Sequence, residues 1–382
     1  MHVKVLQQKW NPDEGWSENS SSVDKKNIQL VFVFGDRFIL SDPKRFEELK
    51  EAFPRAHIIL ASTAGNISGA NLDDASIVVT ALFFEKPLEL QVHRIGISEA
   101  ENSFLAGEIL GKKLPGEGLK HVFLFADGHL VNGSDLISGI VGSVPKSVTI
   151  TGGLAGDGSR FEKTVVGANT PPQEGEIVAV GFYSSHLIFG CGSVGGWDPF
   201  GIERKITRSS ANILYELDGK PALDLYKKYL GEQASQLPGS AMLFPLAIRP
   251  DRQSRALVRT ILSIDEGSQG MVFAGNMPEG WYAQLMKANF DRLVDGAFRA
   301  AMHSFDMVDR ENPGVAILIS CVGRRIVLGP RAEEEIEIVK DLMGQEATIA
   351  GFYSYGEIAP PAPLANSELH NQTMTITTIV EK

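Results

Sequence analysis

The chain has 382 residues, of which 43% are hydrophobic and 22% are charged, a balance typical of a folded globular protein. Its length favours two domains over one. The 47 acidic side chains outnumber the 36 basic ones, and the formal net charge of −11 argues against a general nucleic-acid or anionic-membrane binder, although local basic patches stay open.

Two cysteines, Cys191 and Cys321, are too few for a disulfide framework or a four-thiolate metal site, and they fit a reducing cytoplasm. The first 16 residues are polar and do not resemble a signal peptide. No apolar run approaches the roughly 20 residues that a membrane helix needs. We therefore expect a cytoplasmic protein. Residues 11–27 are rich in Ser, Asn and charge, and we interpret residues 1–27 as an N-terminal loop or extension.

A pattern of strand, helix and strand recurs three times, and in each unit both strands run into glycine-bearing or polar loops. In chain order, the predicted strand, helix and second strand lie at 28–38, 43–53 and 57–69, then at 121–128, 132–144 and 148–158, and finally at 315–325, 333–343 and 347–360. A crossover helix lets its two strands run parallel, so their carboxyl ends fall on one edge of a sheet, where open α/β sheets bind ligands.

The same repeat is also common in α/β proteins of any function, so it indicates the fold more strongly than the function. The stretches between the units favour strands, and an amphipathic helix is predicted at 289–305. We expect a mixed α/β (α+β) fold with large sheets built from the repeated units. The predicted domains are 28–217 and 218–382, because strand-like sequence gives way to PALDLYKKYLG after residue 218.

Six stretches stand out together in a fixed order: TGGLAGDG at 151–158, GGWDPFG at 195–201, ELDGKPALDLYKKYLG at 216–231, SCVGRRIVLG at 320–329, GFYSYGEIAP at 351–360 and LHNQTMTI at 369–376. In order and spacing they resemble the tandem FIST N-terminal and C-terminal domains, from about residue 28 to the end. Each motif alone is weak, and the resemblance rests on all six.

The resemblance implies a sensory module of bacterial signal transduction for small ligands, which are often suggested to be amino acids. One stand-alone branch binds haem, responds to nitric oxide, and regulates a histidine kinase and cyclic-di-GMP output. No kinase, methyl-accepting or diguanylate cyclase segment follows in this sequence. A separate partner is therefore expected, either a histidine kinase or another signalling protein, with neither nucleic acid nor membrane involved.

The glycine run at 152–158 supplies the first candidate ligand contacts. Backbone N–H groups at Gly152 and Gly153 can cradle a carboxylate, a phosphate or a haem propionate, although the order of a dinucleotide fingerprint is missing. Asp157 either contacts a ligand amine or caps its own turn. Asp127, which closes the strand of the second unit, is a further candidate.

The second group of candidates comes from the C-terminal unit. Tyr353 and Tyr355 alternate along one predicted strand and so share a face. Glu357 at the strand exit is expected to pair with Arg324, either as a structural ion pair or as the polar end of a pocket walled by the two rings. Asn371, in the LHNQT stretch, completes the set of predicted ligand contacts.

A haem b group would need an axial ligand, which is most often histidine. Of the eight histidines, His129 and His370 are the ones expected near the ligand edge, although a solvent-exposed or hydrogen-bonded histidine is the commoner situation for each. No CxxCH motif is present, so any haem would be held noncovalently.

An enzyme that uses Cys321, Glu357 or Asp127 is the alternative to a sensor. The sequence shows no Cys–His pattern, HExxH motif, Walker A loop or GxSxG elbow, and Cys321 also reads as a plain buried thiol. Without a recognisable nucleophile–base pair, the sequence favours a sensor over an enzyme.

Overall fold

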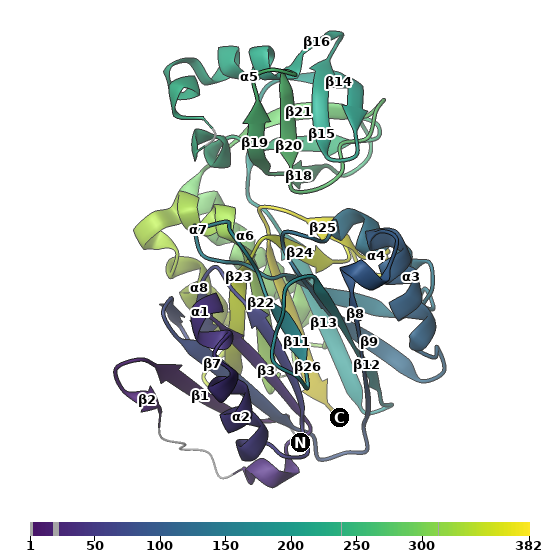
Figure 1. The fold of residues 1–382 in the computed structure, drawn as a ribbon, viewed down its shortest axis with the longest axis vertical. Coiled ribbons are helices and arrows are strands. Elements are labelled where there is room, and N and C mark those ends of the chain that lie inside the picture. Colours follow the sequence, from purple (N-terminus) through teal and green to yellow (C-terminus); the bar gives the residue numbers. More distant parts are fainter. Residues whose placement is uncertain (1–2, 18–22, 238, 312) are drawn as a thin grey trace.

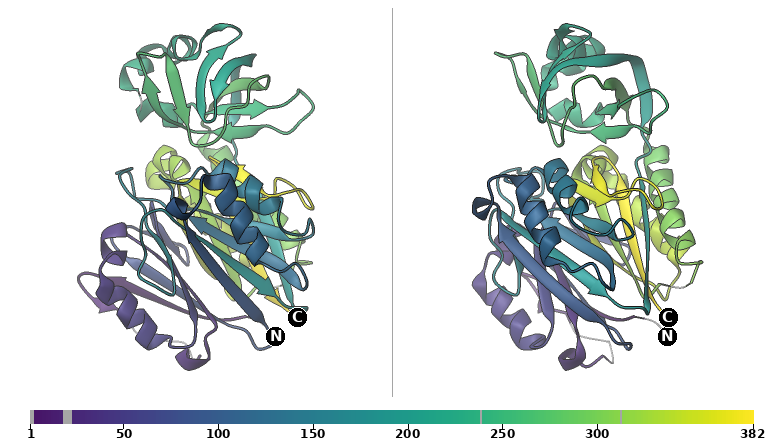
Figure 2. Two further views of the ribbon diagram at one scale, coloured as in Figure 1. Left: turned by 45° about the vertical axis from the view of Figure 1, so that its right-hand side comes forward. Right: turned by 90° about the vertical axis from the view of Figure 1, so that its right-hand side faces the viewer.

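The computed structural model describes residues 3–17, 23–237, 239–311 and 313–382. Within these ranges, eight α-helices accompany three six-stranded sheets and one eight-stranded sheet, which confirms the mixed α/β fold class. The three smaller sheets form a body, and the eight-stranded sheet forms a separate lobe above it (Figures 1 and 2). In the described part, no helix is both long enough and apolar enough to span a membrane.

The first sheet of the body has the order β11-β4-β3-β7-β1-β2. The elements of this unit are β1 (Lys4–Asn11), β2 (Gly15–Trp16), η1 (Lys25–Asn27), β3 (Leu30–Gly35), α1 (Arg37–Leu40), α2 (Pro43–Ala52), β4 (His57–Ser62), β5 (Asn66–Ser68), β6 (Asn71–Asp73) and β7 (Ile77–Phe83). Residues 1–27 were expected to form an N-terminal loop or extension, but residues 4–11 form a strand that pairs with β7 and buries Leu6.

The second sheet has the order β25-β24-β10-β9-β12-β8, and α3 and α4 pack against each other beside it. This unit comprises β8 (Glu89–Gly96), η2 (Ile97–Glu99), α3 (Ser103–Lys113), β9 (Leu119–Ala126), α4 (Gly133–Val141), β10 (Thr149–Leu154), β11 (Val166–Ala168) and β12 (Glu176–Tyr183).

The third sheet has the order β13-β26-β22-β23-β5-β6. Its unit comprises β13 (Leu187–Val194), α6 (Phe290–Asp306), β22 (Val315–Cys321), α7 (Val322–Leu328), η5 (Gly329–Arg331), α8 (Glu334–Met343), β23 (Thr348–Ser354), β24 (Gly356–Ala359), β25 (Glu368–His370) and β26 (Met374–Glu381). The predicted parallel pairs are confirmed in all three units, as β3 with β4, β9 with β10, and β22 with β23.

The three units exchange short strands in a ring. Strand β5 of the first unit joins the third sheet beside β23, and β24 of the third unit joins the second sheet beside β10. Strand β11 of the second unit closes the ring beside β4 of the first sheet. Each exchanged strand follows the second parallel strand of its own unit, so the loops at these strand ends gather at the centre of the body.

The lobe spans residues 198–287 and has its own hydrophobic core. It comprises β14 (Asp198–Ser210), β15 (Ile213–Leu217), β16 (Lys220–Pro221), α5 (Ala222–Leu230), η3 (Gly231–Gln236), η4 (Gly239–Leu243), β17 (Leu246–Arg249), β18 (Leu257–Arg259), β19 (Ile261–Asp265), β20 (Gly270–Phe273) and β21 (Tyr282–Lys287). The predicted division between residues 217 and 218 falls inside this lobe, whose core includes Leu214 on one side of it and Leu223 on the other.

Candidate functional site

A cavity of about 600 Å³ lies between the lobe and the body. Its body side comes from the loop after β9, the end of β10, Phe161, the start of α7 and Tyr355. Its lobe side comes from β15, β19, β20 and the segments beside them, and the lining residues there are Asn212, Met242, Thr260, Leu262, Ser263 and 272–275. Strand ends from both halves of the chain therefore enclose one cavity.

The lining of this inter-lobe cavity is apolar with a few neutral polar groups. Among the described residues, no Asp, Glu, Lys or Arg side chain contributes to it. Leu130 and Leu262 are 56% and 43% exposed, so apolar side chains also flank its opening. Most ligand pockets share this composition, in which apolar walls give affinity and a few polar groups orient the ligand.

An aromatic wall forms part of the cavity lining on the body side. The rings of Phe161 and Tyr355 stack with centroids 4.8 Å apart, and the His129 ring meets Tyr355 edge-on at 5.5 Å. The Tyr355 hydroxyl donates a hydrogen bond to the Gly158 carbonyl at 3.2 Å, which fixes the ring. Phe161 has φ of 53°, a left-handed conformation that is uncommon for a bulky residue. Such strain persists only where the surroundings enforce it, and it is concentrated at binding sites.

Three residues singled out from the sequence lie at this cavity, namely His129, Tyr355 and Cys321. The Cys321 thiol is buried, and burial raises its pKa well above the ordinary value, so it remains a neutral thiol. His129 is exposed, and its ring makes no hydrogen bond among the described residues, which leaves its nitrogens available to a ligand.

Asp127 lies beside the cavity but is committed to its own loop. One carboxylate oxygen accepts hydrogen bonds from the backbone N–H groups of His129 and Leu130, each at 2.7 Å, and the other accepts from Gly175 at 3.0 Å. The side chain is 1% exposed. It therefore shapes the loop that carries His129 and does not contact a ligand itself.

Gly152 and Gly153 lie inside strand β10, so the expected anion-binding loop is not formed by them. A Cβ at Gly152, where φ is 148°, would lie 1.9 Å from the Leu124 carbonyl oxygen of β9, and one at Gly153 would lie 2.8 Å from Ile319. These glycines are needed because neighbouring strands approach closely there.

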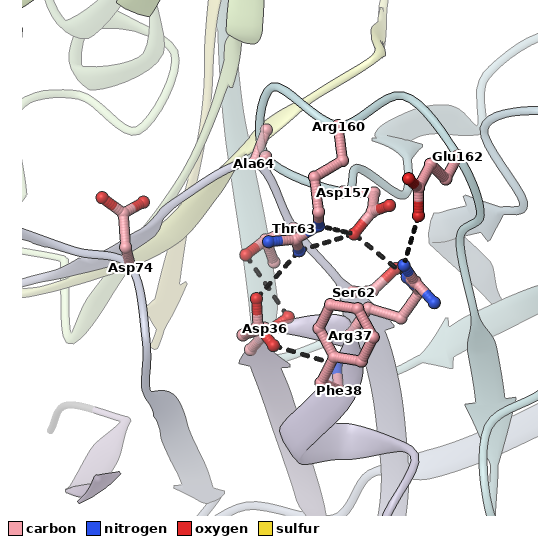
Figure 3. A network of polar contacts seen from close by, with 12 residues as sticks. Asp36, Arg37, Phe38, Ser62, Thr63, Ala64, Asp74, Asp157, Arg160 and Glu162 are labelled. Carbon is pink, nitrogen blue, oxygen red and sulfur yellow. Dashed lines mark hydrogen bonds and ion pairs between the residues drawn. The ribbon is translucent and has the colours of Figure 1, made fainter. Parts of the chain in front are cut away.

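Asp157 is fully buried under two arginines, as Figure 3 shows. Arg37 donates to its carboxylate at 3.1 Å, and Arg160 donates from two nitrogens at 2.8 and 2.6 Å. Burial opposes ionisation, yet the hydrogen bonds from Arg160 and Arg37 hold the pKa of Asp157 below its ordinary value. The expected contact with a ligand amine is not supported, because this carboxylate is already neutralised by protein cations.

Arg324 pairs with Glu335 of α8, so the expected pair with Glu357 is wrong. Its guanidinium donates to the Glu335 carboxylate at 3.0 and 2.6 Å, and it also binds the backbone carbonyls of Gly195 and Leu293. Both side chains are 0% exposed, which identifies a structural ion pair. Tyr353 donates to the same carboxylate at 2.8 Å, and it does not share a cavity wall with Tyr355.

Glu357 is also fully buried, but its partners are uncharged. Ser354 donates to one carboxylate oxygen at 2.8 Å, and the Thr373 backbone N–H and hydroxyl approach the other at 3.1 and 3.0 Å. Burial raises the pKa of Glu357 to about 8, although these hydrogen bonds partly offset the effect. The carboxyl group stands at the equivalent position of Asn66 in the first unit, where Thr63 donates to the amide oxygen at 2.7 Å.

His370 and Asn371 do not reach the inter-lobe cavity. The Nε2 atom of His370 lies 3.0 Å from the Ala359 carbonyl oxygen, and burial lowers the pKa of this histidine to about 3. The neutral ring therefore donates to the backbone, which makes it unsuited to bind iron through that nitrogen. Asn371 is 1% exposed, and neither side-chain atom has a hydrogen-bond partner in the described structure.

The lobe side of the cavity was not predicted. Met242 lies in the 3-10 helix η4, Thr260 lies directly before β19, and Ser263 lies within β19, and no glycine motif or charged cluster marks them. The sequence around them predicted only strands, and nothing in it shows that the lobe folds back over the loop after β9.

The lobe is attached to the body by polar contacts at the cavity and beside it. Arg259 of the lobe donates to the Leu369 carbonyl at 3.0 Å, and Gln372 of the body donates to the Thr260 hydroxyl at 3.0 Å. Asn276 of the lobe bonds to Asn132 and Asp135 on the loop and first turn of α4. Burial lowers the pKa of Arg259 to about 10, so this arginine stays charged at neutral pH.

The described residues contain no cluster of three or more His, Cys, Asp or Glu side chains arranged to hold a metal ion. A crystal structure of cyanuric acid hydrolase from A. caulinodans aligns over 100% of this chain and 99% of its own, with 10% identity and a TM-score of 0.32. A likeness at that level carries no argument about fold or activity.

Two comparisons bear on ancestry. An uncharacterised protein of Methanocaldococcus jannaschii is 23% identical over 359 residues, an alignment that spans 82% of this chain and 66% of the length of that relative. The FIST N domain model matches residues 29–220, and the FIST C domain model matches residues 222–360. These two matches cover most of the sequence in the expected order, and the chain belongs to the FIST family.

Proposed function

We propose that this protein senses an uncharged, largely apolar small molecule, which binds in the inter-lobe cavity. FIST domains are small-ligand sensory domains of signal transduction, so a sensory role agrees with the family. The observation that carries the proposal is the lining itself, which combines the stacked Phe161 and Tyr355 rings with no charged side chain among the described residues.

The absence of charge in the lining decides the ligand class. A free amino acid carries a carboxylate and an ammonium group, and burying either without a partner costs several kcal/mol. An uncharged ligand avoids this cost and gains by covering the apolar wall. The hydroxyl of Ser263 and the ring nitrogens of His129 then orient it, because neither makes a hydrogen bond within the described residues.

Signal output would follow from the position of the ligand between two packed units. A molecule that contacts both Met242 of the lobe and Tyr355 of the body stabilises the arrangement in which both face it. Such a shift in the lobe presents a different surface to a partner protein. A histidine kinase or another signalling protein in the cytoplasm is the partner class that we propose, on the ground of the family.

Haem would need an axial ligand for its iron and polar partners for its propionates. His129 lies at the cavity with an unbonded ring and fits an axial ligand, whereas His370 does not. Haem propionates need cationic or amide partners, and no Lys or Arg lines the cavity in the described residues. The side-chain amides of Asn132 and Asn212, which do line it, already donate to Asn276 and to the Phe273 carbonyl. The lining therefore fits the iron of haem better than its propionates, and our proposal is built on an uncharged ligand. Haem binding stays a prediction, which absorbance spectroscopy of the purified protein tests.

An enzymatic role receives no support from the three residues considered for it. The Cys321 thiol has a raised pKa, Asp127 caps a loop, and Glu357 lies outside the cavity lining. Nucleophilic catalysis needs an activated nucleophile beside a base, and this geometry does not supply one. The sensory reading is therefore preferred.

Thermal-shift screening tests the proposal. Uncharged aromatic and aliphatic compounds should raise the melting temperature, since a ligand at about 100 times its Kd stabilises the fold by roughly 2.7 kcal/mol. Zwitterionic amino acids and haemin form the comparison groups. Shifts with amino acids alone would contradict an uncharged ligand, and flat curves for every group would contradict the sensory proposal.

A pair of variants locates the binding. Ala274→Phe adds a ring to the lobe wall of the cavity and should abolish the shift that an active compound produces. Ala362→Phe adds the same volume on an exposed loop and should leave the shift unchanged. Equal shifts in both variants would place the ligand elsewhere.

A further inference from the structure

A second cavity of about 440 Å³ lies at the centre of the body, where loops of all three units meet. It differs from the inter-lobe cavity in carrying four charged side chains. The charged lining residues are Asp36, Asp74, Arg160 and Arg325, and the apolar ones are Leu72, Val322 and Ile326. Val322 of α7 lines both cavities, so the two sites are neighbours.

Arg325 is fixed by a hydrogen bond to the Ala64 carbonyl and is covered on its solvent side by Asp74. Its Nη1 atom donates to the Ala64 carbonyl oxygen at 2.6 Å, and its two terminal nitrogens bind the two oxygens of Asp74 at 2.6 and 2.7 Å. The Arg325 side chain is 23% exposed, whereas that of Asp74 is 67% exposed. The guanidinium is therefore fixed in place, while the carboxylate that covers it lies mostly in water.

The loop after β4 is shaped to receive this guanidinium. Gly65 has φ of 128°, and a Cβ there would lie 2.6 Å from the Nη1 atom of Arg325. A side chain at this position would strain the backbone and displace the guanidinium from the loop. The position of the Arg325 guanidinium in the cavity is therefore set by the shape of this loop.

The two arginines of the cavity have different partners. Arg160 binds the fully buried Asp157, which cannot leave, and also Asp36 at 2.9 Å. Figure 3 shows that Asp74 lies away from this network. Of the two guanidinium groups, that of Arg325 is the one whose partner, Asp74, can move into solvent.

We propose that this central cavity binds a small carboxylic acid with a short aliphatic body, whose carboxylate replaces Asp74 on Arg325. One bidentate carboxylate takes the place of another, so the guanidinium keeps its paired geometry. The exchange keeps both hydrogen bonds on the guanidinium, and the released Asp74, whose side chain is already 67% exposed, becomes fully hydrated. The aliphatic body then covers Leu72, Val322 and the 44% exposed Ile326, which are the apolar walls beside the fork.

Calorimetric titration with isobutyrate tests this site. The full-length protein should bind isobutyrate saturably, while isobutyramide, its uncharged analogue, should not bind. Asp74→Asn removes the internal competitor and should tighten isobutyrate binding by about tenfold, since a tethered group competes at an effective concentration in the millimolar range. The control is Asp306→Asn at the end of α6, which removes an exposed carboxylate that pairs with Arg310. This variant should leave the affinity for isobutyrate unchanged.

Two further variants complete the test. Arg325→Lys keeps the charge but loses the fork, and should weaken binding at least tenfold; if that variant does not fold, the Asp74→Asn result decides alone. Ala274→Phe, which fills the inter-lobe cavity, should bind isobutyrate as the natural sequence does. The proposal is overturned if Asp74→Asn binds no tighter than Asp306→Asn, or if inorganic phosphate binds and isobutyrate does not.

Discussion

Two buried glutamates in the C-terminal unit show how differently one side chain type can be accommodated. Glu335, on α8, is 0% exposed and receives a guanidinium from Arg324 and a hydroxyl from Tyr353. Glu357, at the start of β24, is equally buried but receives only hydroxyls and one backbone N–H. Glu335 is therefore part of a buried ion pair, whereas Glu357 is a buried carboxyl group with a raised pKa.

This contrast separates structural carboxylates from pH-sensitive ones. The Arg324–Glu335 pair ties α7 to α8 and, through the Leu293 carbonyl, to α6. Glu357 instead holds the turn at Thr373 against Ser354, a task that Asn66 performs as a neutral amide in the first unit. These hydrogen bonds favour the ionised carboxylate, and burial is what raises the pKa of Glu357 and favours its protonated form.

The largest loss of stability is expected from breaking the Arg324–Glu335 ion pair. Arg324→Ala leaves Glu335 buried without a cation and should lower the free energy of unfolding by about 3–5 kcal/mol. Urea denaturation measures this loss. Arg310→Ala, which removes an exposed guanidinium from Asp306, should change stability by less than about 1 kcal/mol. Similar small losses in both variants would contradict a structural role for Arg324.

A smaller change in stability, which depends on pH, is expected from Glu357. Burial raises the pKa of Glu357 from 4.5 to about 8, so between these values the unfolded chain has lost a proton that the folded chain retains. This group therefore makes the protein less stable as pH rises, by up to about 1.4 kcal/mol per pH unit in that window. The contribution is absent below about pH 4.5 and complete above about pH 8.

Glu357→Gln isolates that contribution. The glutamine oxygen can accept from Thr373 while its NH₂ group donates to the Ser354 hydroxyl, so the contacts survive without a titrating group. Relative to the natural sequence, the variant should gain stability steadily from pH 5 to pH 8. Glu337→Gln on the exposed face of α8 is the control. A stability difference that does not change with pH would show that Glu357 ionises normally.

The repeated units could be predicted from the sequence because their apolar runs and helical periodicities are local. Helices α2, α4 and α8 lie where those patterns placed them. Strand β1 was missed because it is stabilised by pairing with β7, about 70 residues away, and a short polar strand has no local signature. The strand exchange among the three units is likewise invisible in any one segment.

The partner of Arg324 was predictable in principle. The helical periodicity at 333–343 places Ile336, Val339 and Met343 on one apolar face, and Glu335 lies one turn before Val339 on that same face. An acidic side chain on a buried helix face needs a cation nearby. The pair with Glu357 was favoured instead because both residues follow strands, which ignores the helix between them.

The glycine run was misread for a physical reason. Gly152 and Gly153 look the same in sequence whether they form a loop or allow two strands to approach closely, and the structure has the second arrangement. The convergence of strand ends on one cavity was nevertheless predictable from the parallel crossovers. Which side chains line that cavity depends on the lobe, whose placement over the loop after β9 is a long-range property.

The methyl signal of Met242 offers the most direct test of the inter-lobe site, because this methionine lines the cavity from the lobe. In a spectrum of the protein carrying ¹³C-methyl methionine, an uncharged compound that raises the melting temperature should shift the Met242 signal. Met307, which packs beside Cys191 outside that lining, should not respond. If such a compound stabilises the protein while the Met242 signal stays unchanged, the ligand does not bind between the lobe and the body.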